Sequence, residues 1–433
     1  MNKEFIICNM APYYPTFLTP AWTLDSVQHP SWKPFYYLFM EKPLTEMGIN
    51  NSIKCFEDID KSKPWFIPLN VNQGSWDWVE EDLWTRFPEE LLNELINGNA
   101  YLLMNNENEY DTLYVFNVFY KMYYKNPKVP INKLIFLTPA ADGEKIYKQF
   151  VIDEKIKDVF KVLYAPHIDL TFDDIIIRNT EYADTTNKGK KYLCLNRAFR
   201  FHRPALVSLL SAENILDRGY VSLGVVPSEE QKMKQHGGDW KSYLHNLFSN
   251  LPWENIPKHF KIKQTMKLGI SSIAEKIPMC LDKTEFVTNY AQWNDMPLDL
   301  IKDSYFSVVT STHFFKWQEP SPGWNEKEWK PILARHPFII AGRPHMLKHM
   351  RRFGIVTFDR WFDESYDDIE DDWERMSAIA KEVYRLSMLS NEEWDRMKQE
   401  MATVLEYNRN VIINKRWELL FYASDLKKLI TYL

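Results

Sequence analysis

Short apolar runs alternate along the first half of the chain with segments whose apolar residues recur every three or four positions. Unbroken apolar runs of four to eight residues are typical of buried strands, and the helical spacing is typical of amphipathic helices. The clearest helix has Pro88 at its first turn and Gly98 as its stop, which are the usual start and stop residues. We expect strands at 4–9, 64–72, 100–104 and 133–138, and helices at 88–98 and 112–124.

This order of strands and helices predicts a parallel sheet, because a helix must carry the chain back before the next parallel strand begins. The second half repeats the pattern after residues 179–191, a polar stretch without apolar periodicity that we interpret as a linker. We expect strands at 191–196, 220–226, 306–310 and 337–341, and helices at 203–213, at 325–335 and after Pro344.

The sequence therefore predicts an α/β fold with two Rossmann-like domains that face each other across a cleft. Residues 1–185 form the expected acceptor-side domain, and residues 190–405 form the expected nucleotide-sugar-binding domain. The chain from 391 onward is helical in pattern, and we expect its last part, 406–433, to pack back on the first domain. A length of 433 residues agrees with two domains, since single cores stop growing at roughly 250 to 300 residues.

Charge and cysteine content narrow the classes of function. The formal net charge is -6, which argues against a general polyanion-binding surface. The 4 cysteines are far apart and form no CxxC pair, so we expect neither a metal site nor a disulfide framework. We expect a cytoplasmic protein without a membrane span, because the apolar runs are too short for a signal peptide or a spanning helix.

Open parallel sheets bind ligands beyond the carboxyl ends of their strands, where helix N-termini favour phosphate. The first such turn of the second half, 196–203, contains Arg197, Arg200 and Arg203. The planar guanidinium donates two parallel charge-assisted hydrogen bonds, which suits a diphosphate. The alternative interpretation is that these arginines are solvated side chains of the first helical turn or partners in interdomain ion pairs.

Two later turns offer further candidates. In the helix that starts near 325, Glu326 and Lys330 lie four residues apart on one face, and Lys327 can turn toward the other domain. Glu328 fits a capping box, and a capped helix with a surface ion pair is the simpler interpretation. After the strand 337–341, Gly342 and Arg343 form a turn where a glycine lets a phosphate approach the backbone.

A resemblance joins these turns. Most of 190–390 resembles a group of glycosyltransferase-like proteins that are often encoded by viruses and phages. The resemblance lies in the runs LCLNRAFRFHRPALVSLL, SVVTSTHFF, NEKEWKPILARHPFIIAGRPHMLKHMRRFGIVTFD and WFDESYDDIEDDWER. This group is distantly similar to fucosyltransferase-type GT-B enzymes. The resemblance implies that Glu326 and Lys327 hold the ribose and diphosphate of the donor, and that one of the three arginines of the first turn binds the diphosphate.

The chain departs from the group's pattern at two positions. Ser311 follows Thr310 where an acidic residue is expected, and the turn after Gly342 holds Arg343 and His345 where a glycine is expected. The acidic run at 363–375 is interpreted as a solvated face, with pairing to the neighbouring basic helix as the alternative.

The function expected from this resemblance is transfer of a sugar from a GDP- or UDP-sugar, a substrate rather than a tightly bound cofactor, to a hydroxyl acceptor without a metal. The basic turns neutralise the leaving diphosphate, and a carboxylate deprotonates the acceptor. The N-domain loops offer Glu109 first and Asp77 second as this base. The acceptor stays open among a glycan, a protein and a modified base of nucleic acid; if the chain is viral, the host cytoplasm is its expected compartment.

Two alternatives remain at this stage. A metal-dependent GT-A enzyme needs a DxD sequence, which Asp58-Ile-Asp60 matches by letter. The other alternative is a catalytically inactive glycosyltransferase fold that serves as a carbohydrate-binding or virion-associated structural protein, which the departures at Ser311 and His345 keep open.

Overall fold

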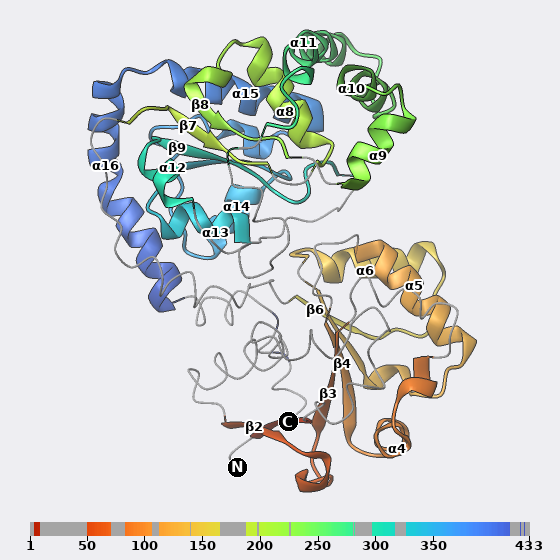
Figure 1. The fold of residues 1–433 in the computed structure, drawn as a ribbon. Coiled ribbons are helices and arrows are strands. Elements are labelled where there is room, and N and C mark those ends of the chain that lie inside the picture. Colours follow the sequence, from red (N-terminus) through yellow and green to blue (C-terminus); the bar gives the residue numbers. More distant parts are fainter. Residues whose placement is uncertain are drawn as a thin grey trace. The chain divides into compact units, whose positions relative to one another are not determined.

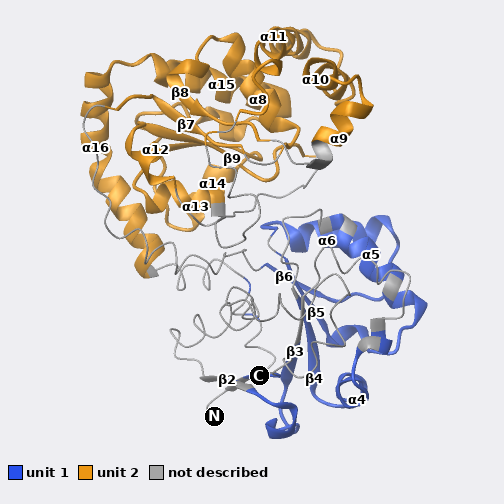
Figure 2. Cartoon of the chain, viewed as in Figure 1, with its two compact units in different colours: residues 1–171, 317–324, 415–433 blue, residues 172–316, 325–414 orange. Residues whose placement is uncertain are grey.

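The computed structural model describes residues 4–8, 50–70, 83–105, 112–138, 140–164, 188–196, 199–224, 227–279, 281, 297–316, 326–415, 425 and 428. The chain divides into two compact units (Figure 2). Unit 1 comprises Met1–Thr171, Trp317–Trp324 and Lys415–Leu433, and unit 2 comprises Phe172–Lys316 and Asn325–Asn414. Each unit contains a sheet flanked by helices (Figure 1).

The sheet of unit 1 has 6 strands in the order β2-β1-β3-β4-β5-β6, and all neighbouring pairs are parallel. Its middle strands have apolar side chains that are buried on both faces, as expected for a parallel sheet covered by helices. The strands are β1 Glu4–Cys8, β2 Asn50–Lys54, β3 Trp65–Asn70, β4 Ala100–Asn105, β5 Leu134–Thr138 and β6 Lys161–Tyr164.

Aromatic side chains fill the core between this sheet and its helices. The ring of Phe116 lies 5.4 Å from that of Phe136 on β5 and 4.9 Å from that of Tyr147, so one aromatic cluster joins two helices to a strand. The helices among the described residues of unit 1 are α4 Glu89–Asn97, α5 Thr112–Lys125 and α6 Gly143–Asp153, with single 3-10 turns at η3 Phe56–Asp58, η5 Leu83–Arg86 and η6 Ile131–Lys133.

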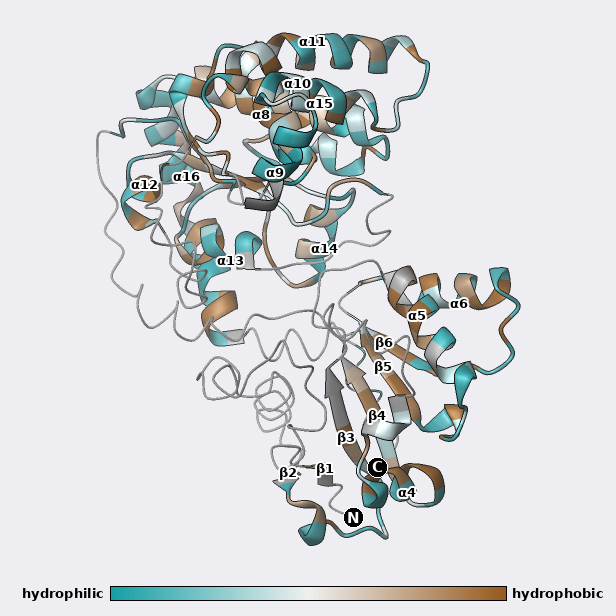
Figure 3. Ribbon diagram, turned by 45° about the vertical axis from the view of Figure 1, so that its right-hand side comes forward, coloured by the Kyte–Doolittle hydropathy of each residue, from teal (hydrophilic) through white to brown (hydrophobic). Residues whose placement is uncertain are grey.

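The sheet of unit 2 has 4 parallel strands in the order β10-β9-β7-β8. Every side chain of β9 and β10 is buried, which matches their uninterrupted apolar sequences. Figure 3 shows hydrophobic colour on β5 and β6 of unit 1 and mostly hydrophilic colour on α9 of unit 2. The strands are β7 Tyr192–Cys194, β8 Gly219–Val221, β9 Phe306–Thr310 and β10 Phe338–Ala341.

An insertion of helices between β8 and β9 packs on α8 His202–Ala212 of unit 2. Gly269 of α11 faces α8 so closely that a Cβ there would lie 1.8 Å from the Ser208 carbonyl oxygen, so the helix contact requires a glycine. The helices that the structure describes in unit 2 are α8 His202–Ala212, α9 Pro227–Gln235, α10 Trp240–Ser249, α11 Pro257–Ala274, α12 Leu298–Lys302, α13 Glu326–Leu333, α14 Met346–Arg352, α15 Asp372–Met388 and α16 Asn391–Asn410. The described shorter turns are η7 Leu216–Arg218, η10 Ser365–Asp368 and the π-helical η11 Val411–Lys415.

Two α/β units with parallel sheets and a helical C-terminal segment confirm the predicted fold class. The linker prediction was too long, because residues 188–191 are bound to unit 2. The Gly189 amide donates to Asp303 Oδ1 at 2.7 Å, and the Lys190 amide donates to Asp303 O at 3.0 Å.

Near the C-terminus, α16 continues through the boundary expected at 405. Farther along, Asp425 pairs with β6 of unit 1, where the Tyr164 amide donates to Asp425 Oδ2 at 3.0 Å.

Candidate anion-binding site

The carboxyl ends of β7, β9 and β10 lie at one edge of the unit 2 sheet, since all its strands are parallel. Asn196 fixes these ends to one another. Its side chain accepts a hydrogen bond from Thr310 Oγ1 at 2.7 Å and donates to Ser222 O at 2.9 Å, which ties β7 to the ends of β9 and β8. Asn196 is fully buried, so this amide serves the framework of the site.

The segment that follows β9, which we call the 311–316 loop, carries a row of carbonyl oxygens. Each of four carbonyls accepts a hydrogen bond from an arginine or histidine of another segment. The pairs are Ser311 O with His202 Nε2 at 2.8 Å, Thr312 O with Arg200 Nη1 at 3.2 Å, Phe314 O with Arg375 Nη2 at 2.8 Å, and Phe315 O with Arg343 Nη1 at 3.5 Å. The loop therefore gathers basic groups from three other segments at one sheet edge.

His313 lies within this basic surrounding. Burial, followed by the charges of Arg200, Arg343 and Lys327, lowers the pKa of His313 from its ordinary 6.5 to about 3, so its ring is neutral at physiological pH. Neither ring nitrogen has a hydrogen-bond partner among the described residues, although both are buried. A buried polar group without a partner costs free energy, and an anion would supply both an acceptor and the compensating charge.

His202 supports the loop from beneath. Its ring is buried and stacks on Phe314, with a centroid separation of 5.7 Å and an interplanar angle of 15°. Burial first, and then the charge of Arg203, lowers the pKa of His202 well below its ordinary value. Because Nε2 donates to the Ser311 carbonyl, the neutral ring carries its proton on that nitrogen.

Helix α13 directs a lysine at the loop. Lys327 Nζ donates to Thr312 Oγ1 at 3.4 Å, and Lys330, one turn later, is half-buried. Glu328 is fully buried and accepts a hydrogen bond from Ser311 Oγ, instead of lying on the surface as a capping-box residue would. The side chain of Glu326, predicted to hold the ribose, lies outside the described residues.

The turn after β10 brings in the second arginine. Arg343 is buried, and Gly342 beside it packs against the 311–316 loop, since a Cβ on Gly342 would lie 2.8 Å from Ser311 Oγ. A side chain at this position would therefore displace Ser311 Oγ, which is bound to the buried Glu328. His345, in the turn where the resemblance expects a glycine, has the left-handed backbone conformation at φ 66° that glycine favours, and its Nε2 lies 2.9 Å from Glu370 Oε1.

The structure thus brings together three of the residues expected from the sequence, Arg200, Lys327 and Arg343, around His313. Arg203 is buried beside them and donates to Thr310 O at 3.4 Å. His313 was not among the residues predicted from the sequence, where its one signal was its place three residues beyond a buried strand. Three other candidates lie outside the described residues: Arg197, Glu109 and Asp77.

The solvated-face interpretation of residues 363–375 is wrong for several carboxylates. Asp367 is buried and accepts hydrogen bonds from the amides of Leu347 at 2.9 Å and Lys348 at 3.0 Å. Its carboxylate therefore binds the free amides at the N-terminus of α14. Glu364 is buried and pairs with Arg351 of the same helix, which confirms the alternative of pairing with the basic helix.

The DxD letters fall on a turn of unit 1. Asp58 ends the 3-10 turn η3, and exposed Asp60 accepts hydrogen bonds from Ser62 N at 3.2 Å and Ser62 Oγ at 2.6 Å. Within the described ranges, no three His, Cys, Asp or Glu side chains gather as a metal site. Among the same residues, no helix combines the length and the apolar character that crossing a bilayer requires.

Comparison with known proteins adds two solved structures. No protein-family model and no curated protein matches the sequence. The crystal structure of a DNA-modifying β-glucosyltransferase, determined with and without uridine diphosphoglucose, is similar at a TM-score of 0.42 and 11% identity, covering 99% of this chain and 100% of that one. A UDP-forming α,α-trehalose-phosphate synthase from Burkholderia xenovorans is similar at a TM-score of 0.41 and 11% identity, covering 96% and 86%. Both similarities are too weak to assign an activity or a site residue.

Proposed function

We propose that this protein is a glycosyltransferase that transfers a sugar from a nucleotide-sugar donor to a hydroxyl acceptor, and that unit 2 binds the donor diphosphate. The observation that carries this proposal is the convergence of Arg200, Lys327 and Arg343 on the 311–316 loop, which holds His313, at the carboxyl edge of a parallel sheet. The sequence resemblance to GT-B glycosyltransferases supports this assignment for Lys327 and for one arginine of the 196–203 turn, which includes Arg200.

The proposed chemistry explains why several cations are needed at one point. Sugar transfer passes through an oxocarbenium-like state while negative charge grows on the leaving diphosphate. Arg200, Lys327 and Arg343 stabilise that charge, and His313 donates one hydrogen bond to it. Since fixed side chains provide this stabilisation, the proposed reaction needs no metal ion.

Ser311 and His345 depart from the pattern of the group that the sequence resembles, but the local structure at both residues supports an active site. Ser311 replaces an acidic residue, yet its hydroxyl binds the buried Glu328, so a carboxylate from α13 lies at this position. His345, in the turn where a glycine is expected, adopts the left-handed backbone conformation that glycine favours. We therefore propose an active enzyme rather than an inactive fold.

The base and the acceptor are proposed from the sequence alone. Glu109, and after it Asp77, are the candidates that would take the proton of the acceptor hydroxyl. A glycan, a protein side chain or a modified nucleobase each offers such a hydroxyl.

Thermal denaturation with GDP, UDP, CDP and their sugars tests the donor assignment. We expect one nucleotide to raise the midpoint of the wild-type protein, because a ligand that binds only the folded state stabilises it. Lys327→Ala should remove most of that shift, since Lys327 lies against the 311–316 loop. EDTA should leave the shift unchanged.

The matched control is Lys348→Ala, an α14 lysine whose amide, but not its ammonium group, is used in the contacts described above. The control should retain the full nucleotide shift. If no nucleotide shifts the wild-type midpoint while a glycan does, the protein is a carbohydrate-binding member of the fold, and the proposal is wrong. A shift that EDTA abolishes would contradict metal independence.

A further inference from the structure

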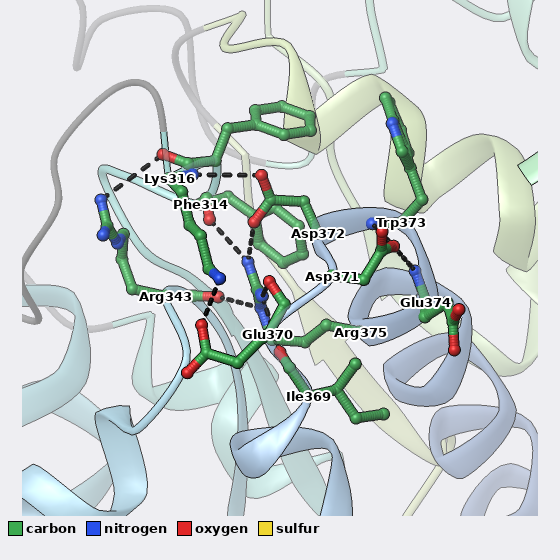
Figure 4. A network of polar contacts seen from close by, with 12 residues as sticks. Phe314, Lys316, Arg343, Ile369, Glu370, Asp371, Asp372, Trp373, Glu374 and Arg375 are labelled. Atoms are coloured by element: carbon green, nitrogen blue, oxygen red, sulfur yellow. Dashed lines mark hydrogen bonds and ion pairs between the residues drawn. The ribbon is translucent and has the colours of Figure 1, made fainter. Parts of the chain in front are cut away.

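Arg375, in the first turn of α15, is a charged side chain with only 1% of its surface exposed. Its guanidinium makes hydrogen bonds to carbonyls of three separate segments and to one carboxylate. The acceptors are Gly342 O at 3.0 Å, Phe314 O at 2.8 Å, Ile369 O at 2.9 Å, Glu370 O at 3.4 Å and Asp372 Oδ1 at 2.6 Å. Figure 4 shows the guanidinium among these groups.

Two of these acceptors lie next to residues of the anion site. Phe314 O belongs to the residue after His313, and Gly342 O belongs to the residue before Arg343. One planar guanidinium, bound at Nη2 and at Nε, therefore spans the 311–316 loop and the turn after β10 (Figure 4). Its rigid fork fixes the separation of the two carbonyls, which a flexible ammonium group does not.

Asp372 completes the attachment of the loop. One carboxylate oxygen binds Arg375 Nη2, and the other accepts from the Lys316 amide at 3.1 Å, so the end of the 311–316 loop is held too. The Arg375 guanidinium also lies 4.5 Å from the centre of the Phe314 ring. A buried cation that lacked these partners would be strongly destabilising, so they compensate its loss of hydration.

The helix that carries Arg375 is itself anchored at its first turn. Asp371 caps α15 by accepting from the amides of Trp373 at 3.0 Å and Glu374 at 2.8 Å. The same carboxylate accepts from His259 Nε2 of α11 at 2.8 Å. The guanidinium is therefore presented from a fixed backbone, as a residue that positions others must be.

We propose that Arg375 is a positioning residue: it sets the spacing between His313 and Arg343 so that the pair matches a diphosphate rather than a single phosphate. This inference rests on the proposed function. Arg375 acts through the two backbone segments and touches no substrate. Its loss should therefore weaken the recognition of two linked phosphates more than that of one.

The ratio of the dissociation constants for a nucleoside monophosphate and the matching diphosphate measures this spacing. We expect the wild-type protein to prefer the diphosphate, and Arg375→Lys and Arg375→Gln to reduce that preference roughly tenfold or more. Affinities are measured well below the unfolding temperature of each variant. A purely structural arginine would change both affinities alike and leave the ratio constant.

The control is Arg385→Gln on the same helix. Arg385 also makes several hydrogen bonds, to Glu382 and to the Trp361 carbonyl, but none to the two segments of the site. If both Arg375 variants fail to fold, Asp372→Asn provides the test, since it loosens Arg375 while Asp371 still caps α15. It should reduce the ratio in the same direction.

The outcomes separate the inference from the proposed function. Folded Arg375 or Asp372 variants that keep the wild-type preference for the diphosphate would overturn the positioning role and leave the donor site intact. If the wild-type protein binds neither nucleotide, the proposed function is wrong and the positioning role falls with it.

Discussion

Alanine in place of Arg200 is expected to weaken the binding of a nucleoside diphosphate by roughly tenfold to a hundredfold, because a charge-assisted hydrogen bond contributes about 1.5–3 kcal/mol. Arg200 is half-buried, and its bond to Thr312 O directs the guanidinium at the 311–316 loop. Combining Arg200→Ala with Lys327→Ala removes two of the three cations around His313 and should reduce affinity by roughly a thousandfold. Isothermal titration calorimetry measures both losses.

Arg360→Ala is the control for net charge. Arg360 is an exposed arginine of the same unit, and its guanidinium lies 5.2 Å from the Trp361 ring centre. Its removal should leave the affinity within about twofold. Equal losses for Arg200→Ala and Arg360→Ala would mean that the nucleotide responds to overall charge and has no specific site in unit 2.

Lowering the pH is expected to strengthen the binding of a nucleotide sugar, by roughly tenfold between about pH 8 and pH 5. In the free protein, burial and three cations hold the pKa of His313 at about 3, so the ring is neutral. A bound diphosphate places negative charge at the ring and raises this pKa, so binding takes up a proton. The nucleotide sugar is the suitable ligand, because its diester phosphates do not titrate in this range.

The stability of the free protein is expected to decrease as the pH is lowered, whereas the affinity for the nucleotide sugar increases. His313 and His349 both have a pKa lowered to about 3, mainly by burial, against an ordinary value of 6.5. Between these values the unfolded chain binds more protons than the folded one, so the free energy of unfolding falls as the pH decreases below about 6.5.

His313→Gln should make the affinity for the nucleotide sugar independent of pH. An affinity that is flat in the wild-type protein would mean that His313 does not meet the diphosphate.

Much of the fold could be predicted from the sequence, because the central strands carry their own signal. β5, β9 and β10 are continuous apolar runs, and burial on both faces makes them so. The strand β6, which begins with an exposed lysine, and the helix α11 were not predicted. The buried face of α11 includes His259 and Gly269, and its exposed face includes Phe260 and Leu268, so its amphipathic pattern is blurred.

The residues of the candidate site that lie near the ends of strands could be predicted from the sequence. Arg343 comes two residues after an apolar strand, Arg200 lies in the turn between a strand and a helix, and Lys327 lies in the first turn of a helix near the same edge. His313 was missed because a lone histidine in a short turn has no pattern of its own. Arg375 was missed for a different reason: it lies in an acidic run that is typical of a solvated surface, and only tertiary packing shows that it is buried beneath the 311–316 loop.

A crystal structure of the wild-type protein with the nucleoside diphosphate that stabilises it would test the central claim most directly. We expect phosphate oxygens within hydrogen-bonding distance of the His313 ring and of the side chains of Arg200, Lys327 and Arg343. A nucleotide bound with its diphosphate away from these four side chains would mean that unit 2 does not bind the donor at this site.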